Sequence, residues 1–255
     1  MNLEDEVSDV VGKALRGLEM SPTEVARAAG VGKDDLQRIL DGGFDQALVR
    51  KIAPFLGLDA DALAGLPSYL PNARSIKGVR RIILPFREWT VNAWLLEISG
   101  KVLLFDTGWG GDDILSEIDP SAVDMVLITH GHPDHVGGIE ALEKKGKRVI
   151  SETEAQVVGE FEFGEISVRA VDLSGHCEPA VGYFVKGFQR QLLVAGDAIF
   201  AGSAGGCANR RKFHLALENL RAVLEIAEEE CLILPGHGPM TSVAEEKTAN
   251  PFLGY

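Results

Sequence analysis

The chain has 255 residues, of which 45% are hydrophobic, and this length and composition suit one large globular domain, or a medium domain with a small companion. Its formal net charge of −13 argues against a general affinity for nucleic acid, which needs a basic face. No apolar run approaches the roughly 20 residues of a membrane-spanning helix, and the acidic residues 1–6 lack the pattern of a signal peptide. Three scattered cysteines are too few for a disulfide framework and fit a reducing compartment, so we expect a cytoplasmic protein.

Residues 1–66 have a helical pattern and are predicted to form a small all-α domain. Ser21-Pro22-Thr23-Glu24 is a capping box with proline at the first helical position, which predicts that a helix begins there. Gly30-Val31-Gly32 ends this helix, and residues 33–40 form the next one. Two short helices around a glycine turn resemble the helix-turn-helix domain of the Cro and phage-repressor type.

The charge of this helical domain does not favour DNA binding. The helix that would enter the groove begins Lys33-Asp34-Asp35, and its two carboxylates would repel phosphates. From Met1 to Asp61 the chain holds 12 acidic and 7 basic residues, a net charge of −5, whereas DNA-reading domains normally carry the opposite balance. We therefore interpret residues 1–66 as a packing or dimerisation module, through which the chain would form a homodimer.

Residues 67–78 look like a linker, and residues 79–255 are predicted to form a second domain. The linker holds two prolines and no periodicity. Two helices are predicted in the second domain, at residues 138–145 and 213–229. Short apolar runs bounded by turn residues predict strands at 81–86, 93–98, 102–105, 123–128, 166–173, 181–185, 192–195 and 231–234. Strands with interspersed helices imply a layered α/β or α+β domain.

Five of the six histidines gather in three short segments, each just after the end of a predicted strand. Imidazole and carboxylate together are the ligand set of zinc, iron or manganese. Loops at the ends of rigid strands carry reacting groups, so strands that point the same way would bring these segments to one rim. The histidines and their acidic neighbours are His130, His132, His135, His176 and His237, with Asp106, Asp134 and Asp197.

The spacing within the first cluster favours two metal ions. His130 and His132 are two residues apart, so in an extended segment they point to the same side and can grip one metal. Asp134 and His135 are adjacent, and a turn at Pro133 can aim them at a second metal. Three nitrogens on one metal leave an open position for water, as in catalytic rather than structural sites.

The run His130-Gly131-His132-Pro133-Asp134-His135, followed in order by His176, Asp197 and His237, resembles the metallo-β-lactamase superfamily. The resemblance extends from about Val79 to the C-terminus and implies an αββα sandwich. It is greatest to the small glyoxalase-II-like hydrolases, or hydroxyacylglutathione hydrolases. The segments typical of them are Phe105-Asp106-Thr107-Gly108, Ala195-Gly196-Asp197 and Pro235-Gly236-His237-Gly238-Pro239.

The resemblance implies a site for two divalent metal ions, for which we expect zinc, with iron or manganese as alternatives. It assigns His130, His132 and His176 to the first metal. It assigns Asp134, His135 and His237 to the second. Asp197 would bridge the two ions, and Asp106 would steady the site from behind the ligands.

The same resemblance implies a hydrolase in which a metal-bridging hydroxide attacks a thioester or ester carbonyl. Asp134 would orient that hydroxide and accept its proton. Arg210, Arg211 and Lys212 precede or open a predicted helix, where cations oppose the helix dipole. Binding of an anionic substrate, such as an anionic thioester, is one explanation for these three residues, and a solvated loop is the other.

Two other functions remain open. A mononuclear iron oxygenase that resembles persulfide dioxygenases would share ligands such as His130, His176 and Asp197, although the complete second ligand set favours the hydrolase. A ligand-sensing regulator would bind DNA through the N-terminal domain, although the acidic helix counts against it.

Overall fold

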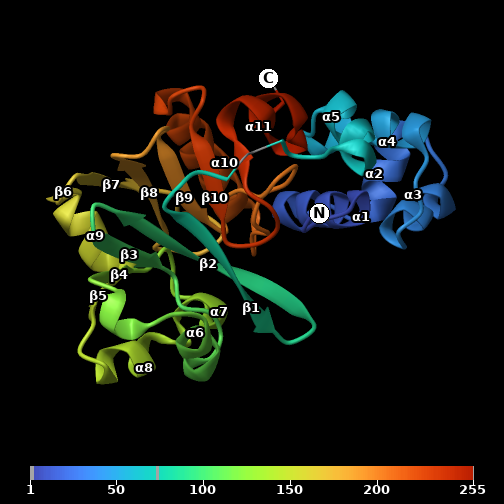
Figure 1. The fold of residues 1–255 in the computed structure, drawn as a ribbon. Helices are drawn as coiled ribbons and strands as arrows, with labels where there is room; N and C mark the ends of the chain where they lie inside the picture. The colour runs from blue at the N-terminus through green and yellow to red at the C-terminus, as the bar shows by residue number, and fades with distance from the viewer. Residues whose placement is uncertain (1–2, 73–74, 255) are drawn as a thin grey trace.

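The computed structural model describes residues 3–72 and 75–254, which form a helical N-terminal region followed by two packed β-sheets (Figure 1). Within these residues, five α-helices precede the first strand. They are α1 (Val7–Leu18), α2 (Pro22–Ala29), α3 (Lys33–Leu40), α4 (Gln46–Ile52) and α5 (Ala60–Gly65), with short 3-10 turns η1 (Ala53–Leu56) and η2 (Leu66–Ser68). None of the helices in the described part of the chain is both long and apolar enough to cross a membrane.

The N-terminal helices begin and end where their capping residues require. The side chain of Ser21 accepts a hydrogen bond from the backbone of Glu24, whose carboxylate in turn accepts from the backbone N–H of Ser21, so the predicted capping box is present. Gly30 ends α2 in a left-handed conformation, and α3 begins at Lys33. The predicted helix pair is therefore confirmed, whereas its interpretation as a DNA-binding or dimerising helix-turn-helix stays a prediction.

The remainder of the chain forms two mixed sheets. The first has the strand order β1-β2-β3-β4-β5, with β3 and β4 parallel, and the second has the order β11-β10-β9-β8-β7-β6, with β9 and β10 parallel. The strands of the first sheet are β1 (Val79–Phe86), β2 (Trp89–Ile98), β3 (Lys101–Phe105), β4 (Met125–Leu127) and β5 (Arg148–Ile150). Those of the second are β6 (Glu160–Phe163), β7 (Ile166–Asp172), β8 (Val181–Lys186), β9 (Leu192–Gly196), β10 (Leu232–Pro235) and β11 (Thr241–Ser242).

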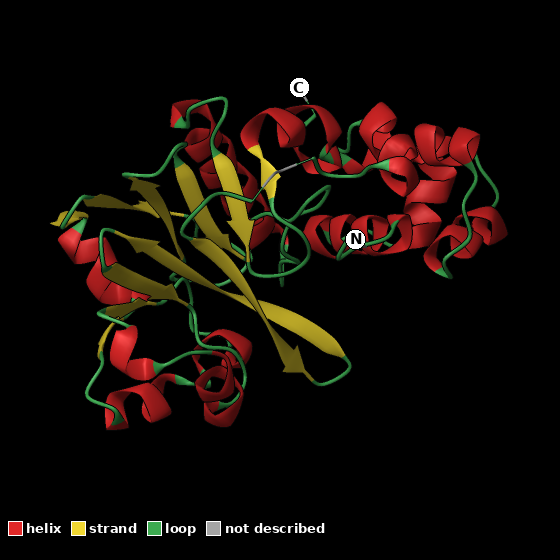
Figure 2. Ribbon diagram, in the orientation of Figure 1, coloured by secondary structure: helices red, strands yellow, loops and turns green. Residues whose placement is uncertain are grey.

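Three buried clusters show that the sheets lie between layers of helices. Side chains such as Leu103 and Val194 fill the space between the two sheets. On the outer face of the first sheet, Ile114 and Leu142 bring the helices of residues 111–144 against the strands, and on the outer face of the second sheet Leu224 and Val243 do the same. Figure 2 shows these helix and strand layers. The arrangement is the αββα sandwich that the sequence implied.

Six α-helices surround the sheets in the part of the chain that the structure describes. Their bounds are α6 (Gly111–Glu117), α7 (Pro133–Val136), α8 (Ile139–Lys144), α9 (Glu152–Val158), α10 (Arg210–Ile226) and α11 (Val243–Ala249), with 3-10 turns η3 (Pro120–Ala122) and η4 (Pro251–Leu253). Of these, α8 and α10 correspond to the two predicted helices. The eight predicted strands are all present with shifted ends, while β5, β6 and β11 were not predicted. These three strands have four residues or fewer, too few for periodicity to reveal.

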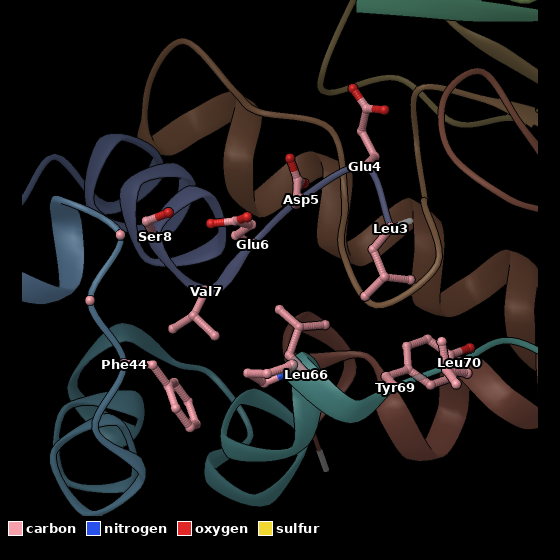
Figure 3. A pocket seen from close by; sticks show the side chains of 13 residues that line it. Leu3, Glu4, Asp5, Glu6, Val7, Ser8, Phe44, Leu66, Tyr69 and Leu70 are labelled. Atoms are coloured by element: carbon pink, nitrogen blue, oxygen red, sulfur yellow. The ribbon is translucent and has the colours of Figure 1, made fainter. Parts of the chain in front are cut away.

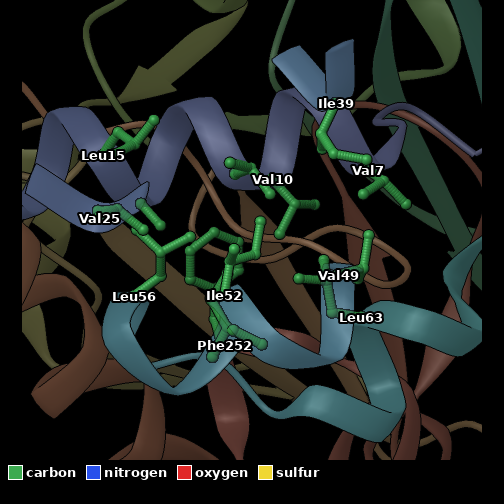
Figure 4. Close-up of a cluster of buried hydrophobic side chains, with 14 of the residues drawn as sticks. Val7, Val10, Leu15, Val25, Ile39, Val49, Ile52, Leu56, Leu63 and Phe252 are labelled. Atoms are coloured by element: carbon green, nitrogen blue, oxygen red, sulfur yellow. The ribbon is translucent and has the colours of Figure 1, made fainter. Parts of the chain in front are cut away.

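The N-terminal helices share their hydrophobic core with the C-terminal part of the chain. Side chains of α1 pack against Val25, Ile52 and Leu56 and also against Phe213 of α10 and Phe252 of η4 (Figure 4). Residues 73 and 74 of the predicted linker 67–78 lie outside the described residues. The first part of this linker is held by Tyr69, whose hydroxyl donates to the carboxylate of Glu246 at 2.7 Å. A division into domains at residues 66 and 79 stays a prediction, but the packing couples α1 to the sandwich.

Candidate metal centre

The predicted ligands come together at one rim of the two sheets. β3 and β4 are parallel and end next to Asp106 and His130. In the second sheet β7, β9 and β10 run in the same direction, because β8 is antiparallel to both β7 and β9 while β9 and β10 are parallel. The loops after these strands carry His176, Asp197 and His237. The convergence expected from the strand ends is therefore present.

A first group of ligand atoms is formed by His130, His132, His176 and Asp197, whose atoms all lie within 4.8 Å of one another. Nδ1 of His132 lies 3.1 Å from Nε2 of His130 and 3.0 Å from Nε2 of His176. Oδ2 of Asp197 lies 3.5 Å from Nε2 of His176. Three nitrogens and one carboxylate oxygen thus point into a single small volume, as a divalent metal ion requires.

A second group lies beside the first and is formed by Asp134, His135 and His237. Oδ2 of Asp134 lies 3.4 Å from Nε2 of His237 and 3.9 Å from Nε2 of His135. Asp197 also reaches this group, since its Oδ1 lies 3.2 Å from Nε2 of His135 and its Oδ2 lies 3.5 Å from Nε2 of His237. The carboxylate of Asp197 therefore lies within reach of ligand atoms in both groups.

Four histidines are held through the ring nitrogen that faces away from the centre. Asp106 lies behind His135, with 2.8 Å between its Oδ2 and Nδ1, and the hydroxyl of Thr129 lies 3.0 Å from Nδ1 of His130. Backbone carbonyl oxygens of Gly206 and Thr90 accept from Nδ1 of His176 and His237 at 2.6 and 2.7 Å. Contacts of this kind fix the ring orientation and leave Nε2 free for a metal ion.

The charges of the centre favour a cation. Burial lowers the pKa of His135, but the carboxylates of Asp197 and Asp106 outweigh it and raise that pKa to about 10. Burial likewise lowers the pKa of His237, while Asp197 and Asp134 raise it to about 11. Burial raises the pKa of Asp197, yet the charges of His135 and His237 hold it well below its usual value. The carboxylates thus stabilise positive charge at this position.

Two buried atoms of the centre lie 3.2 Å apart without forming a hydrogen bond, which fits a metal ion bound to both. Nε2 of His135 and Oδ1 of Asp197 are fully buried and make no hydrogen bond. Burial without a partner costs a polar group about 1–3 kcal/mol, and a metal ion between these atoms would remove that cost. Nitrogen and carboxylate donors without thiolate suit divalent zinc, iron or manganese. The residues therefore fit a pair of divalent ions.

Comparison with known proteins agrees with this geometry. Residues 86–152, which include His130, His132, Asp134 and His135, match the model of the metallo-beta-lactamase superfamily. The chain contains a metallo-β-lactamase superfamily domain. The matched segment includes His130 and His132, which lie between β4 and α7, Asp134 and His135, which lie within α7, and Asp106 behind them.

Relatives of this metallo-β-lactamase domain include proteins named as hydrolases. "Probable metallo-hydrolase YqgX" of Bacillus subtilis is 26% identical over 206 residues, which cover 67% of this chain and 95% of the relative. "Hydroxyacylglutathione hydrolase GloC" of Haemophilus influenzae is 23% identical, covering 67% of this chain and 96% of the relative. The crystal structure of BLEG-1 B3 metallo-beta-lactamase superposes with a TM-score of 0.56 and 20% identity over 69% of this chain and 100% of that protein, so the two share a fold.

The three basic residues at the start of α10, unlike the predicted metal ligands, do not gather around a common point. The guanidinium of Arg210 donates to the backbone carbonyl of Leu18 at 3.0 Å through Nε, and that of Arg211 pairs with Glu178 at 2.6 Å. Lys212 belongs to the first turn of α10, where Asn209 accepts from its backbone N–H. Arg210 and Arg211 thus have partners within the chain, and substrate binding by all three residues stays a prediction.

The metal groups open into a cavity of about 660 Å³, which we call the metal pocket. One wall consists of His132, His176 and His237, and another is supplied by Glu4, Lys13 and Arg16 from the N-terminal segment and α1. Sequence reasoning did not predict these three N-terminal residues, because their place beside the metal groups results from the packing of α1 on α10. No local motif marks them.

Proposed function

We propose that the protein is a metal-dependent hydrolase that cleaves a thioester or ester, in the manner of hydroxyacylglutathione hydrolases. The observation that carries this proposal is the pair of adjacent ligand groups linked by the carboxylate of Asp197. A relative named as a hydroxyacylglutathione hydrolase supports the substrate class.

In this proposal each ligand has a role. His130, His132 and His176 hold one divalent ion, and Asp134, His135 and His237 hold the other, with Asp197 shared. When bound, the two ions supply a water of lowered pKa and a polarising centre for a carbonyl oxygen. We propose zinc as the metal, with iron or manganese as the alternatives that the same nitrogen and carboxylate donors accommodate.

Asp134 is the residue that we propose to move the proton. It is 7% exposed, and its pKa stays below the usual value, because the hydrogen bond from His237 and the charge of His135 outweigh the effect of burial. A carboxylate in this state can orient a water molecule and accept its proton. Asp106 orients His135 by accepting from its Nδ1, and it acts through that ligand rather than on the substrate.

The first experiment is to determine metal content per chain by mass spectrometry on protein purified without added metal, together with hydrolysis of a panel of thioesters, esters and lactones. Two zinc ions per chain and hydrolysis of a thioester support the proposal. One iron ion per chain, an empty second group and oxygen uptake with a persulfide would replace it with the iron oxygenase.

A histidine pair supplies the matched control. His176→Ala removes a proposed ligand, whereas His214→Ala changes an exposed histidine of α10 that contacts neither group. We expect His176→Ala to lose metal and activity and His214→Ala to keep both. Equal activity of the two variants would contradict the assignment of the first group.

A further inference from the structure

The N-terminal segment forms a wall of the metal pocket with two oppositely charged ends. At one end, Oε1 of Glu4 lies 3.7 Å from Nδ1 of His237. Figure 3 shows Leu3 and Val7 turned toward Leu66 and Glu4 pointing the opposite way. At the other end, Lys13 and Arg16 lie one turn apart on α1 and face the loop of Gly206.

Arg16 lies directly against the loop that holds a proposed metal ligand. A Cβ atom built on Gly206 would be 3.3 Å from Nη2 of Arg16, and the carbonyl oxygen of the same glycine accepts from Nδ1 of His176. Only one residue, Gly206, therefore lies between the guanidinium and the imidazole of the first metal group. The absence of a side chain at Gly206 leaves room for this approach.

Most cations around this end of the pocket are already used within the chain. Lys13 pairs with Asp5 and donates to the carbonyl oxygen of Ala204 at 3.0 Å. Arg210 bonds to Leu18, and Arg211 to Glu178. The bonds of Lys13 and Arg210 hold α1 and the N-terminal segment against the sandwich, and Arg211 pairs within the sandwich, so all three side chains are neutralised or occupied.

Two cations remain. Within the described residues, the side chains of Arg16 and Lys212 have neither a hydrogen bond nor an ion pair. Arg16 lines the pocket, and the charge of Lys212 acts on the thiol of Cys207, which also lines it. Lys212 does not line the pocket itself, and its charge also acts on Glu178. In a chain of net charge −13, the guanidinium of Arg16 in the pocket wall, with a second cation near Cys207, is a local site of opposite sign that attracts anions.

We propose that the metal pocket binds the oxyanion end of its substrate, a carboxylate or phosphate, through the guanidinium of Arg16, with Lys212 in support, so that α1 is part of the substrate site. This inference rests on the proposed function, because it requires the metal groups to be loaded, and it names the substrate as anionic. The oxyanion would lie at the His176 end, away from the carboxylate of Glu4. A guanidinium fork matches both carboxylate and phosphate geometry.

The test measures equilibrium binding to the full chain loaded with its co-purifying metals, by calorimetry. The probes are acetate, the linear dicarboxylates from succinate to adipate, and 3-phosphonopropionate. Acetate has a single carboxylate and cannot contact the metals and Arg16 at once, whereas a longer probe with two anionic ends can. We expect Arg16→Gln to weaken the best longer probe about tenfold, as loss of a charge-assisted hydrogen bond implies, and to leave acetate unchanged.

Arg27→Gln is the matched control, because Arg27 is also an exposed arginine in the last turn of a short helix. Arg27→Gln should leave the affinity for every probe unchanged. Arg16→Lys should bind the longer probes more tightly than Arg16→Gln does, and Lys212→Gln should weaken their binding less than Arg16→Gln does. A larger loss for phosphonopropionate than for the dicarboxylates identifies a phosphate, and the reverse identifies a carboxylate.

Three results would overturn the proposal. The first is that the wild type binds none of the longer probes, and the second is that Arg16→Gln leaves their binding unchanged. The third is that Arg16→Gln weakens acetate binding as much as it weakens the binding of the longer probes. An arginine that only complements the dipole of α1 would lower the melting temperature without changing the ratio between probes. Because no turnover is measured, failure of the hydrolysis panel counts against the proposed reaction and leaves the binding result intact.

Discussion

Asp106 lies behind His135 and holds it in place, with 2.8 Å between Oδ2 of the carboxylate and Nδ1 of the imidazole. The same carboxylate accepts from the backbone N–H and the hydroxyl of Thr129, both at 2.8 Å, next to His130. Asp106 adopts a left-handed backbone conformation with φ of 58°, which asparagine tolerates better than most residues. One buried carboxylate thus supports ligands of both metal groups.

We expect Asp106→Asn to lower metal affinity about 10–100-fold, because both carboxylate oxygens accept hydrogen bonds, whereas the neutral amide has one acceptor oxygen and turns a donor toward either Thr129 or His135. The backbone conformation is retained by this substitution, so the loss reports on the contact. Competition with a chelating dye measures it. Asp61→Asn, which changes a side chain that is 85% exposed, is the control, and equal affinities of the two variants would contradict the role of Asp106.

Asp197 is predicted to serve both metal groups, so its loss should affect both. We expect Asp197→Asn to reduce the occupancy of both metals, whereas His237→Ala reduces that of the second metal alone. Native mass spectrometry resolves the species with none, one or both metals bound. If Asp197→Asn loses only one metal, the carboxylate is not shared between the groups.

The convergence of the proposed metal ligands was predictable because each belongs to a short motif that follows an apolar strand. The strands could be recognised from their own residues, and the parallel pairs then bring their ends to one rim. Asp106 could be predicted in the same way, since it directly follows β3. In these segments the local pattern and the tertiary position depend on the same residues.

The position of α1 could not be predicted in this way. Arg16 is an exposed residue of an amphipathic helix, and its place beside His176 depends on the packing of α1 against Phe213 and Phe252. The predicted linker shows the same limit. Pro71 lies in irregular backbone as expected, whereas Pro67 belongs to the 3-10 turn η2, and the contact between Tyr69 and Glu246 joins residues far apart in the sequence.

Close packing of α1 on α10 gives a prediction about two glycines of the same helix. A Cβ on Gly17 would lie 2.4 Å from Cδ2 of Phe213, whereas a Cβ on Gly12 meets no atom within 4 Å. We expect Gly17→Ala to lower the free energy of unfolding by about 1–3 kcal/mol through overpacking. Gly12→Ala should raise it by up to about 1 kcal/mol through helix propensity.

Urea denaturation of the two variants and the wild type distinguishes these effects. Because Arg16 precedes Gly17, a shift of α1 in Gly17→Ala should also weaken binding of the dicarboxylate probes, and Gly12→Ala should leave it unchanged. Destabilisation of equal size in both variants would show that α1 does not pack as described.

The buried carboxylate of Glu246 gives a prediction about pH. It accepts from the hydroxyls of Tyr69 and Thr241, each at 2.7 Å, and from the backbone N–H of Gly202 and the amide of Asn250 at 2.9 and 2.8 Å. Burial raises the pKa of Glu246 above its usual value despite these hydrogen bonds. The folded protein therefore binds this proton more tightly than the unfolded chain does.

It follows that the stability contributed by protonated Glu246 is full below the usual pKa and is lost as the pH rises through the raised pKa. Glu246→Gln removes this loss, and its amide can donate to the two hydroxyls, whose direction is free to reverse. We therefore expect the unfolding free energy of Glu246→Gln relative to the wild type to increase from about pH 4 to about pH 7, measured by urea denaturation across that range. Glu246→Leu, which leaves the backbone N–H of Gly202 without an acceptor while the amide of Asn250 keeps the carbonyl oxygen of Ser203, should be less stable at every pH by about 1–3 kcal/mol. A relative stability of Glu246→Gln that stays constant or decreases with pH would contradict the raised pKa, because the titration of all other groups cancels in this difference.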